Sequence, residues 1–137
     1  MYLLDTDICI FMIRGKHPQL IEKIEALPAE KVFLSAVTHA ELEFGVANSR
    51  DPERNRTALE LFVSAFEILP FETIHARIYG EIRAYLSRRG TPIGPYDLQI
   101  AAQALTHDYC LITNNIAEFS RIPGLKSPSI TFNHSES

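Results

Sequence analysis

The chain has 137 residues, of which 46% are hydrophobic and 22% are charged, and its formal net charge is −4. This size and composition predict a single soluble globular domain over residues 1–137. No apolar run approaches the roughly 18 residues that span a bilayer, and the first residues lack the basic region of a signal peptide. We therefore expect a cytoplasmic protein with no membrane partner.

Strand-like and helical patterns alternate along the chain. Strands are predicted at residues 2–4, 31–36, 67–69, 109–113 and 130–132. Helices are predicted at residues 8–13, 19–27, 38–47, after residue 51, at 74–86 and from residue 97. The polar tail 133–137 is expected to fray. This alternation predicts an α/β fold with a parallel sheet of about four to five strands, flanked by helices.

Three acidic residues, Asp5, Glu41 and Asp97, each lie where an apolar run ends and a helical pattern begins. In a parallel α/β sheet, the carboxyl ends of the strands share the edge where ligands bind. Carboxylates that converge there repel one another unless a cation joins them. Mg²⁺ takes oxygen ligands, usually one or two carboxylates with waters and substrate phosphates. The pattern predicts a metal-dependent site for phosphoryl transfer or hydrolysis.

Each of these acids also has a structural interpretation. Asp5 and Asp97 could cap helices, and Glu41 could pair with Thr38 in a capping box. The two interpretations are compatible, because a helix start favours an ionised carboxylate. The end of the predicted strand 109–113 also brings oxygen-bearing side chains to this edge, which helix capping alone does not require.

The net negative charge argues against a nucleic-acid partner, since phosphate binding usually needs a basic surface. Bound divalent ions would cancel about two to four of the negative charges. Four arginines also precede the predicted helix of Asp97: Arg77, Arg83, Arg88 and Arg89. They are either phosphate contacts or part of a solvated helix face, and both interpretations stay open.

Cysteine and histidine offer no clear alternative chemistry. The two cysteines lie in apolar segments without a partner motif, so we expect buried reduced thiols at Cys9 and Cys110. Two histidines could act as acid and base in a metal-free ribonuclease. We instead expect surface or helix-end positions for all five: His17, His39, His75, His107 and His134.

Four segments in order resemble the PIN-domain ribonucleases, most closely the VapC toxins of bacterial toxin–antitoxin pairs. They are residues 3–7 (LLDTD), 35–45 (SAVTHAELEFG), 94–101 (GPYDLQIA) and 112–119 (ITNNIAEF). The resemblance implies a PIN-like three-layer fold and a Mg²⁺-dependent endoribonuclease, with Mn²⁺ as a substitute ion. It implies hydrolysis of structured RNA, such as tRNA or ribosomal RNA, by water with the help of the cation.

The same resemblance assigns roles within the site. Asp5 and Asp97 would bind the metal directly, and Glu41 would bind a second ion or orient the water. Asn115 completes the predicted catalytic set. The expected supporting residues are Thr6, Asp7, Thr113 and Glu118.

The chain departs from the family pattern at two positions. Asp7 stands where many relatives carry Asn, and Asn115 stands where many carry a fourth acid, with Glu118 three residues on. Asn115 can coordinate through its carbonyl or hold a water, but it adds no charge. We expect one well-bound Mg²⁺ and a second ion that arrives with substrate.

The resemblance also implies a homodimer and a VapB-type antitoxin. A strongly negative pocket is most simply blocked by a basic side chain, and Arg binds carboxylates bidentately. We expect an antitoxin segment that folds upon binding and presents an Arg or Lys. Ile10, Phe11 and Ile13 are the predicted walls of its groove.

Two other functions fit part of the sequence. Residues 2–7 also resemble the opening of haloacid-dehalogenase-type phosphatases, in which the first Asp is a nucleophile. Those enzymes need a late lysine, and the only lysine after Lys31 is Lys126. The second alternative is a catalytically silent PIN-like or receiver-like regulatory module, although all three main carboxylates are intact.

Overall fold

The computed structural model describes residues 1–127, so the predicted strand 130–132 and the tail 133–137 lie outside the described residues. These described residues contain four strands: β1 (Tyr2–Leu4), β2 (Val32–Ser35), β3 (Glu67–Leu69) and β4 (Cys110–Ile112). The α-helices are α1 (Thr6–Arg14), α2 (Pro18–Glu25), α3 (Ala36–Ala47), α4 (Pro52–Val63), α5 (Thr73–Arg88), α6 (Pro95–His107) and α7 (Ile116–Phe119). A 3₁₀ turn, Ala29–Lys31, precedes β2. The elements predicted within residues 1–127 are confirmed, and α7 is an additional short helix.

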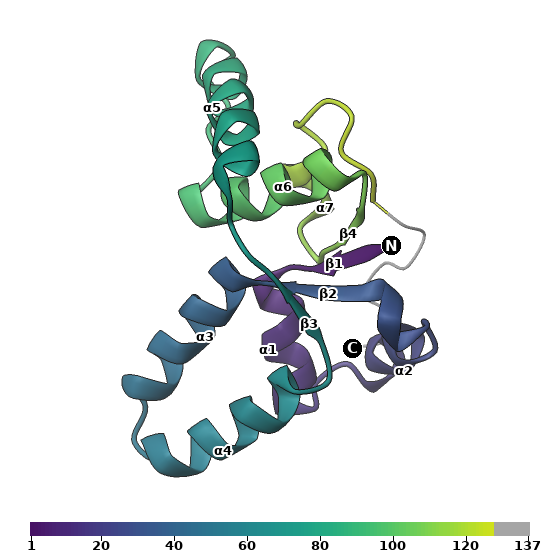
Figure 1. Cartoon of the computed structure of the whole chain (residues 1–137), viewed down its shortest axis with the longest axis vertical. Helices are drawn as coiled ribbons and strands as arrows, with labels where there is room; N and C mark the ends of the chain where they lie inside the picture. The colour runs from purple at the N-terminus through teal and green to yellow at the C-terminus, as the bar shows by residue number, and fades with distance from the viewer. Residues whose placement is uncertain (128–137) are drawn as a thin grey trace.

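The four strands form a parallel sheet in the order β3-β2-β1-β4 (Figure 1). The chain moves outward from β1 through β2 to β3, and then returns to the other side of β1 for β4. This change of direction makes the carboxyl ends of β1 and β4 a topological switch point, where open α/β sheets bind ligands. Asp5 follows β1 directly, and its backbone N–H donates to the carbonyl oxygen of Ile112 at the end of β4 (3.1 Å).

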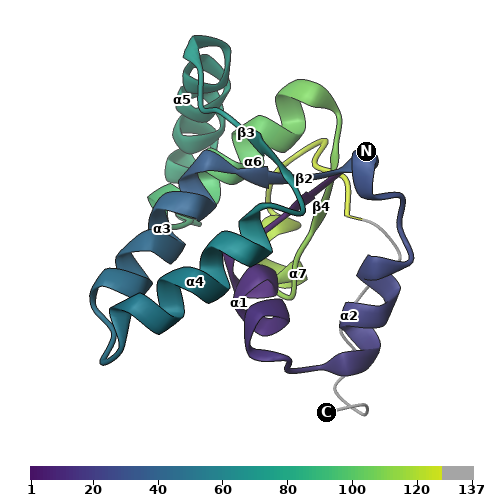
Figure 2. The same cartoon turned by 60° about the horizontal axis from the view of Figure 1, so that its bottom comes forward.

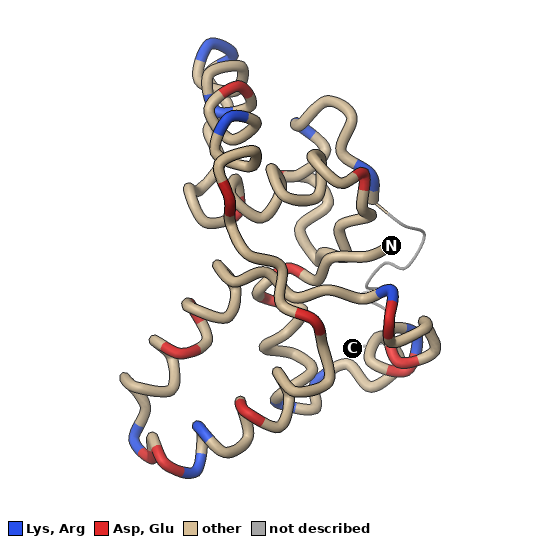
Figure 3. The backbone as a smooth tube through the Cα atoms, viewed as in Figure 1, with Lys and Arg blue, Asp and Glu red and all other residues tan. Residues whose placement is uncertain are grey.

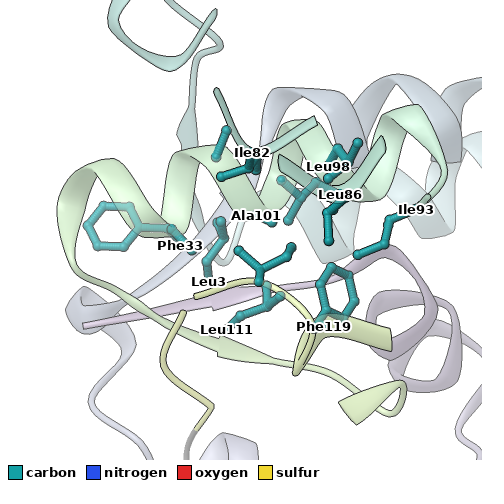
Figure 4. Close-up of a cluster of buried hydrophobic side chains, with 13 residues drawn as sticks. Leu3, Phe33, Ile82, Leu86, Ile93, Leu98, Ala101, Leu111 and Phe119 are labelled. Atoms are coloured by element: carbon teal, nitrogen blue, oxygen red, sulfur yellow. The ribbon is translucent and has the colours of Figure 1, made fainter. Parts of the chain in front are cut away.

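Alternating strand residues pack into two cores, one on each face of the sheet. Leu3, Phe33 and Leu111 pack with residues of α5, α6 and α7 (Figure 4). Leu4, Leu34 and Ile112 belong to a second cluster with residues of α1, α2, α3 and α4. Figures 1 and 2 show the two helical groups on opposite sides of the strands. The fold has the predicted three layers, because successive strand side chains point to opposite faces.

The N-caps of α1, α3 and α6 show which of the three acids cap a helix. Asp5 is the N-cap of α1, as expected, and accepts from the Ile8 N–H (2.9 Å). Ser35 caps α3 by accepting from the Val37 N–H, so the alternative interpretation of Thr38 and Glu41 as a capping box does not hold. Asp97 is not a cap either, because the N-cap of α6 is Gly94 and Asp97 is the third residue of the helix. The side chains of Glu41 and Asp97 are therefore not used as caps.

His75 lies at a helix end, as predicted, but its burial was not expected. It lies in the first turn of α5, yet it is fully buried rather than at the surface. Its Nδ1 accepts from the Glu72 N–H (2.9 Å), and its Nε2 lies 2.8 Å from Nε2 of His107. Burial and the neighbouring His107 lower the pKa of His75. This pair joins α5 to the far end of α6 from Asp97, so it supplies no acid or base to the carboxylates.

The structure also bears on the expectations for the two cysteines and for membrane-spanning segments. Cys9 is a buried free thiol, and Cys110 is also free but only half-buried. Within residues 1–127, none of the helices is both long and apolar enough to cross a membrane.

Candidate active site

Asp5 is the most buried acid of the site. Its Oδ1 accepts from the Ile8 N–H, and its Oδ2 accepts from the Thr113 hydroxyl at 2.5 Å. Burial raises the pKa of Asp5 to about 7, although these two hydrogen bonds lower it and the charges of Asp7 and Asp97 raise it further. The chain thus holds a carboxyl group at the switch point in a position that is unfavourable for its charge.

Asp97 approaches the site from the first turn of α6. It is half-buried, and its pKa is raised to about 6. Burial is the largest cause, and the charges of Glu118, Glu41 and Asp7 add to it. These carboxylates therefore lie close enough to repel one another. The structure brings together acids from four separate segments of the chain, as the sequence predicted.

Glu41 is connected to α1 through a hydroxyl group. The Thr6 hydroxyl donates to Oε1 of Glu41 (2.9 Å) and lies 3.0 Å from the Thr38 hydroxyl. Thr6 is buried and directly follows Asp5, so this contact places Glu41 beside the first acid. Thr38 was missed as a site residue. Its available signal was a threonine one helical turn before the candidate acid, a pattern that by itself suggests only a cap.

The loop after β4 supplies the remaining predicted residues. Oγ1 of Thr113 accepts from the Asn115 N–H (2.9 Å) while its proton goes to Asp5. The side-chain amide of Asn115 donates to Oε2 of Glu118. Asn115 thus holds Glu118, whose charge acts on Asp97. The prediction that Asn115 itself coordinates a metal stays a prediction.

The donor set fits a hard divalent cation. The site offers carboxylate and hydroxyl oxygens, and none of the ion pairs found within residues 1–127 involves Asp5, Glu41 or Asp97. No three His, Cys, Asp or Glu side chains in this part of the chain are already gathered as a metal cage. A cation here would need water or substrate oxygens to complete its shell, which is how Mg²⁺ is usually bound.

Lys126 is badly placed for the phosphatase alternative. Its ammonium group pairs with Asp108 (2.7 Å), and its backbone bridges Cys110 at the start of β4. This is the amino end of the strand, whereas Asp5 and Thr113 lie at the carboxyl end. The late lysine that such a phosphatase needs is therefore at the wrong edge of the sheet.

Two hollows adjoin Glu41. One, of about 820 Å³, lies between α3 and α6 and is lined by Phe44, Phe71, Tyr96 and Gln99 among others. The other, of about 390 Å³, lies between α1, α3 and α4, where Ile10, Ile13 and Leu59 contribute apolar surface. A ligand in either hollow would reach the carboxylates.

Comparison with known proteins agrees with this geometry. The PIN domain family model matches residues 2–125. The chain is 42% identical to the tRNA(fMet)-specific endonuclease VapC of Salmonella typhimurium strain LT2, over 91% of this chain and 94% of the relative. It is 40% identical to Ribonuclease VapC2 of Rickettsia felis, again over 91% and 94%.

Solved structures give the same result. The DNA-bound VapBC structure from Salmonella typhimurium matches with a TM-score of 0.87 and 41% identity, over 93% of this chain and 96% of the other. The VapBC2 structure from Rickettsia felis, bound to a promoter DNA fragment, also has a TM-score of 0.87, with 36% identity over 96% and 98%. The chain therefore belongs to the PIN-domain family, and within it to the VapC ribonucleases.

Proposed function

We propose that this protein is a Mg²⁺-dependent endoribonuclease toxin that hydrolyses phosphodiester bonds of structured RNA. The observation that carries the proposal is the convergence of Asp5, Glu41 and Asp97 at the switch point without a basic partner among the described residues. The names of the relatives support the nuclease class, and one of them is named as specific for tRNA(fMet). Purified tRNA is accordingly the first substrate to test.

In this mechanism, Asp5 and Asp97 would provide the carboxylate oxygens that hold a divalent cation. A bound Mg²⁺ would offset the phosphate charge and lower the pKa of a water molecule. Glu41 has one oxygen occupied by Thr6 and the other available to accept a proton from the attacking water. The Thr113 hydroxyl holds Asp5 in place through Oδ2.

Helix α5 offers positive charge for the RNA backbone. Figure 3 shows several basic segments along this helix, all of them arginine, with one acidic segment between them, and the helix extends away from the sheet. Arg83 and Arg89 lie over the rings of Tyr79 and Tyr85, and both guanidinium-bearing side chains are exposed. Helix α5 packs against α6, which carries Asp97. An RNA bound along α5 would therefore extend toward the carboxylates of the active site. Phosphate contacts from these arginines would reconcile RNA binding with a net charge of −4.

A VapB-type antitoxin would block the site from the smaller hollow. The related solved structures are VapBC complexes. Ile10 and Ile13 line this hollow as predicted, and Glu41 lies at it. Phe11 is not among the lining residues and instead packs edge-on against His17. An apolar antitoxin segment in the hollow would bring an Arg or Lys to the carboxylates, since a basic group there relieves their repulsion.

The decisive experiment measures tRNA cleavage by the purified protein before and after metal removal. EDTA should abolish cleavage, and added Mg²⁺ or Mn²⁺ should restore it. Persistent cleavage in the thoroughly chelated protein would overturn the metal-dependent mechanism. Trapping of an aspartyl phosphate on Asp5 would instead favour a phosphatase.

A second experiment concerns the antitoxin. Removing its proposed basic side chain should restore metal-dependent cleavage within an intact complex. A complex that stays fully inhibited would show that the blockage is steric. Homodimer formation is also part of the proposal, and light scattering during size-exclusion chromatography tests it directly. The cytoplasmic location stays a prediction.

A further inference from the structure

Thr38 is a fully buried hydroxyl residue in α3, one turn before Glu41. Its Oγ1 lies 3.0 Å from Oγ1 of Thr6, which in turn lies 2.9 Å from Oε1 of Glu41. Three polar groups from α1 and α3 thus form one continuous hydrogen-bonded chain. It ends on a carboxylate of the site described above.

The donor and the acceptor of each hydrogen bond in this series follow from counting the hydroxyl protons. An ionised carboxylate can only accept, so the single hydroxyl proton of Thr6 goes to Glu41. The oxygen of Thr6 is then left as an acceptor, and Thr38 must be the donor to it. Each donated bond polarises the next hydroxyl, which strengthens the bond to the carboxylate in a region of low dielectric.

Thr38 contrasts with another helical threonine of the chain. Thr106 in α6 donates its hydroxyl to the carbonyl oxygen of Ala102 in its own helix (2.7 Å). Thr38 instead directs its hydroxyl across to α1. This geometry connects the two helices that carry Thr6 and Glu41. A hydrogen bond to a carbonyl oxygen of its own helix would have been enough to satisfy the buried hydroxyl of Thr38.

We propose that Thr38 is a positioning residue, which acts through Thr6 to fix the Glu41 carboxylate in the orientation in which Oε1 accepts from Thr6. The inference rests on the proposed nuclease function for its consequence in catalysis. Glu41 is half-buried and borders two hollows, so without this restraint its side chain has room to adopt other rotamers. A fixed orientation matters, because supporting hydrogen bonds tune both metal affinity and rate.

The test compares Thr38→Val, which removes the hydroxyl at nearly constant volume, with Thr38→Ser, which keeps it. Thr106→Val is the matched control. Calorimetry with Mn²⁺ and single-turnover cleavage of tRNA are the two measurements. Thr38→Val should lower Mn²⁺ affinity several-fold and cleavage about tenfold. Thr38→Ser should recover most of both, and Thr106→Val should change neither.

A double-mutant cycle separates positioning from general packing. In a Glu41→Gln background, Thr38→Val should cause no further loss of Mn²⁺ affinity, because the carboxylate that it orients is already gone. An additive loss, or an unchanged affinity and rate in Thr38→Val alone, would overturn the proposal. If Thr38→Val does not fold, the same cycle is measured with Thr38→Cys, whose S–H is only a weak donor.

The two proposals can fail separately. If the wild-type protein binds Mn²⁺ but cleaves no RNA, the proposed nuclease function fails while the coupling between Thr38 and Glu41 is still measured. If the wild-type protein cleaves RNA and Thr38→Val cleaves equally well, the nuclease function stands and the positioning role of Thr38 fails.

Discussion

Two polar clusters lie at the same edge of the sheet and differ in charge. At the ends of β2 and β3, the fully buried Gln103 accepts from the Ser35 hydroxyl (2.5 Å) and donates to the carbonyl oxygens of Leu69 and Pro70 (both 3.1 Å). At the ends of β1 and β4, Asp5 accepts two hydrogen bonds, yet its pKa is still raised to about 7. We call Ser35 and Gln103 the neutral cluster, and Asp5 with the neighbouring Glu41 and Asp97 the acidic cluster.

The two clusters differ in their expected effect on the stability of the metal-free fold. The neutral cluster has a partner for each polar atom of Gln103, so it joins α6 to two strands without a charge to desolvate. The acidic cluster also satisfies its hydrogen bonds, but its carboxylates repel one another in a poorly solvated place. Hydrogen bonding alone does not compensate for like charges. The acidic cluster is therefore expected to destabilise the metal-free fold and to be relieved by a cation.

The largest expected effect comes from removing one charge from the acidic cluster. Asp5→Asn should reduce RNA cleavage by roughly a thousandfold or more, equivalent to about 4 kcal/mol of lost transition-state stabilisation. At neutral pH the metal-free variant should be more stable than wild type by about 1–3 kcal/mol, because a costly charge is gone while the amide oxygen can still cap α1. Cleavage assays and urea unfolding measure the two effects.

Asp51→Asn is the matched control, because Asp51 caps α4 by accepting from the Arg54 N–H and lies outside the acidic cluster. It should leave cleavage unchanged. Asp97→Asn should behave like Asp5→Asn. A folded variant at Asp5 or Asp97 that cuts RNA at the wild-type rate would show that the carboxylate is not required.

Breaking the neutral cluster should have the opposite effect on stability. Gln103→Leu leaves the Ser35 hydroxyl and two carbonyl groups without their partner, which should lower the free energy of unfolding by about 2–4 kcal/mol. Gln19→Leu, at an exposed position of α2, is the control. Urea unfolding measures the loss, and calorimetry with Mn²⁺ should show unchanged affinity. A stable Gln103→Leu protein would contradict the assigned role of this network.

The pH dependence of stability sharpens the comparison. The folded-state pKa values of Asp5 and Asp97, about 7 and about 6, lie above their ordinary value of 3.8. Between pH 4 and 7 the folded protein therefore binds more protons than the unfolded chain, and its stability falls as pH rises. His75 acts in the opposite sense, because its lowered pKa favours the folded state as pH rises toward 6.5.

The difference between wild type and Asp5→Asn cancels the contribution of His75 and isolates that of Asp5. From pH 5 to 7.5, metal-free wild type should lose about 2 kcal/mol relative to the variant. Urea unfolding at both pH values measures this difference. Parallel pH profiles of the two proteins would contradict the raised pKa of Asp5, and saturating Mg²⁺ should reduce the loss in wild type.

The smallest expected effect concerns Asn115, whose amide group holds Glu118. Asn115→Asp removes that donor and adds a carboxylate, so the metal-free protein should lose about 0.5–1 kcal/mol of stability. Affinity for Mg²⁺ or Mn²⁺ should rise several-fold, because the new charge is near a bound ion. Calorimetric titration checks the affinity. An unchanged value would mean that residue 115 points away from the cation.

Much of the candidate site could be predicted from local patterns. Asp5 and Asp97 were identified because each follows or begins an element of clear periodicity, and the structure places both at the predicted edge. The role of Thr38 could not be found in this way. A local pattern made it a cap for its own helix, whereas its hydroxyl meets Thr6, which is 32 residues away in the chain. The burial of His75 could not be found in this way either, because its contact with His107 lies 32 residues away in the chain.

The sequence by itself determined which side chains share a face of each element, because strand and helix periods are local properties of the backbone. It thereby predicted helices α1 to α6, strands β1 to β4, the parallel sheet and the set of acids at its carboxyl edge. Only the tertiary structure decided that β4 pairs with β1, which brings the Thr113 hydroxyl to Asp5 across 108 residues of chain. Periodicity does not specify the neighbour of a strand, because that choice depends on how the two cores pack as a whole.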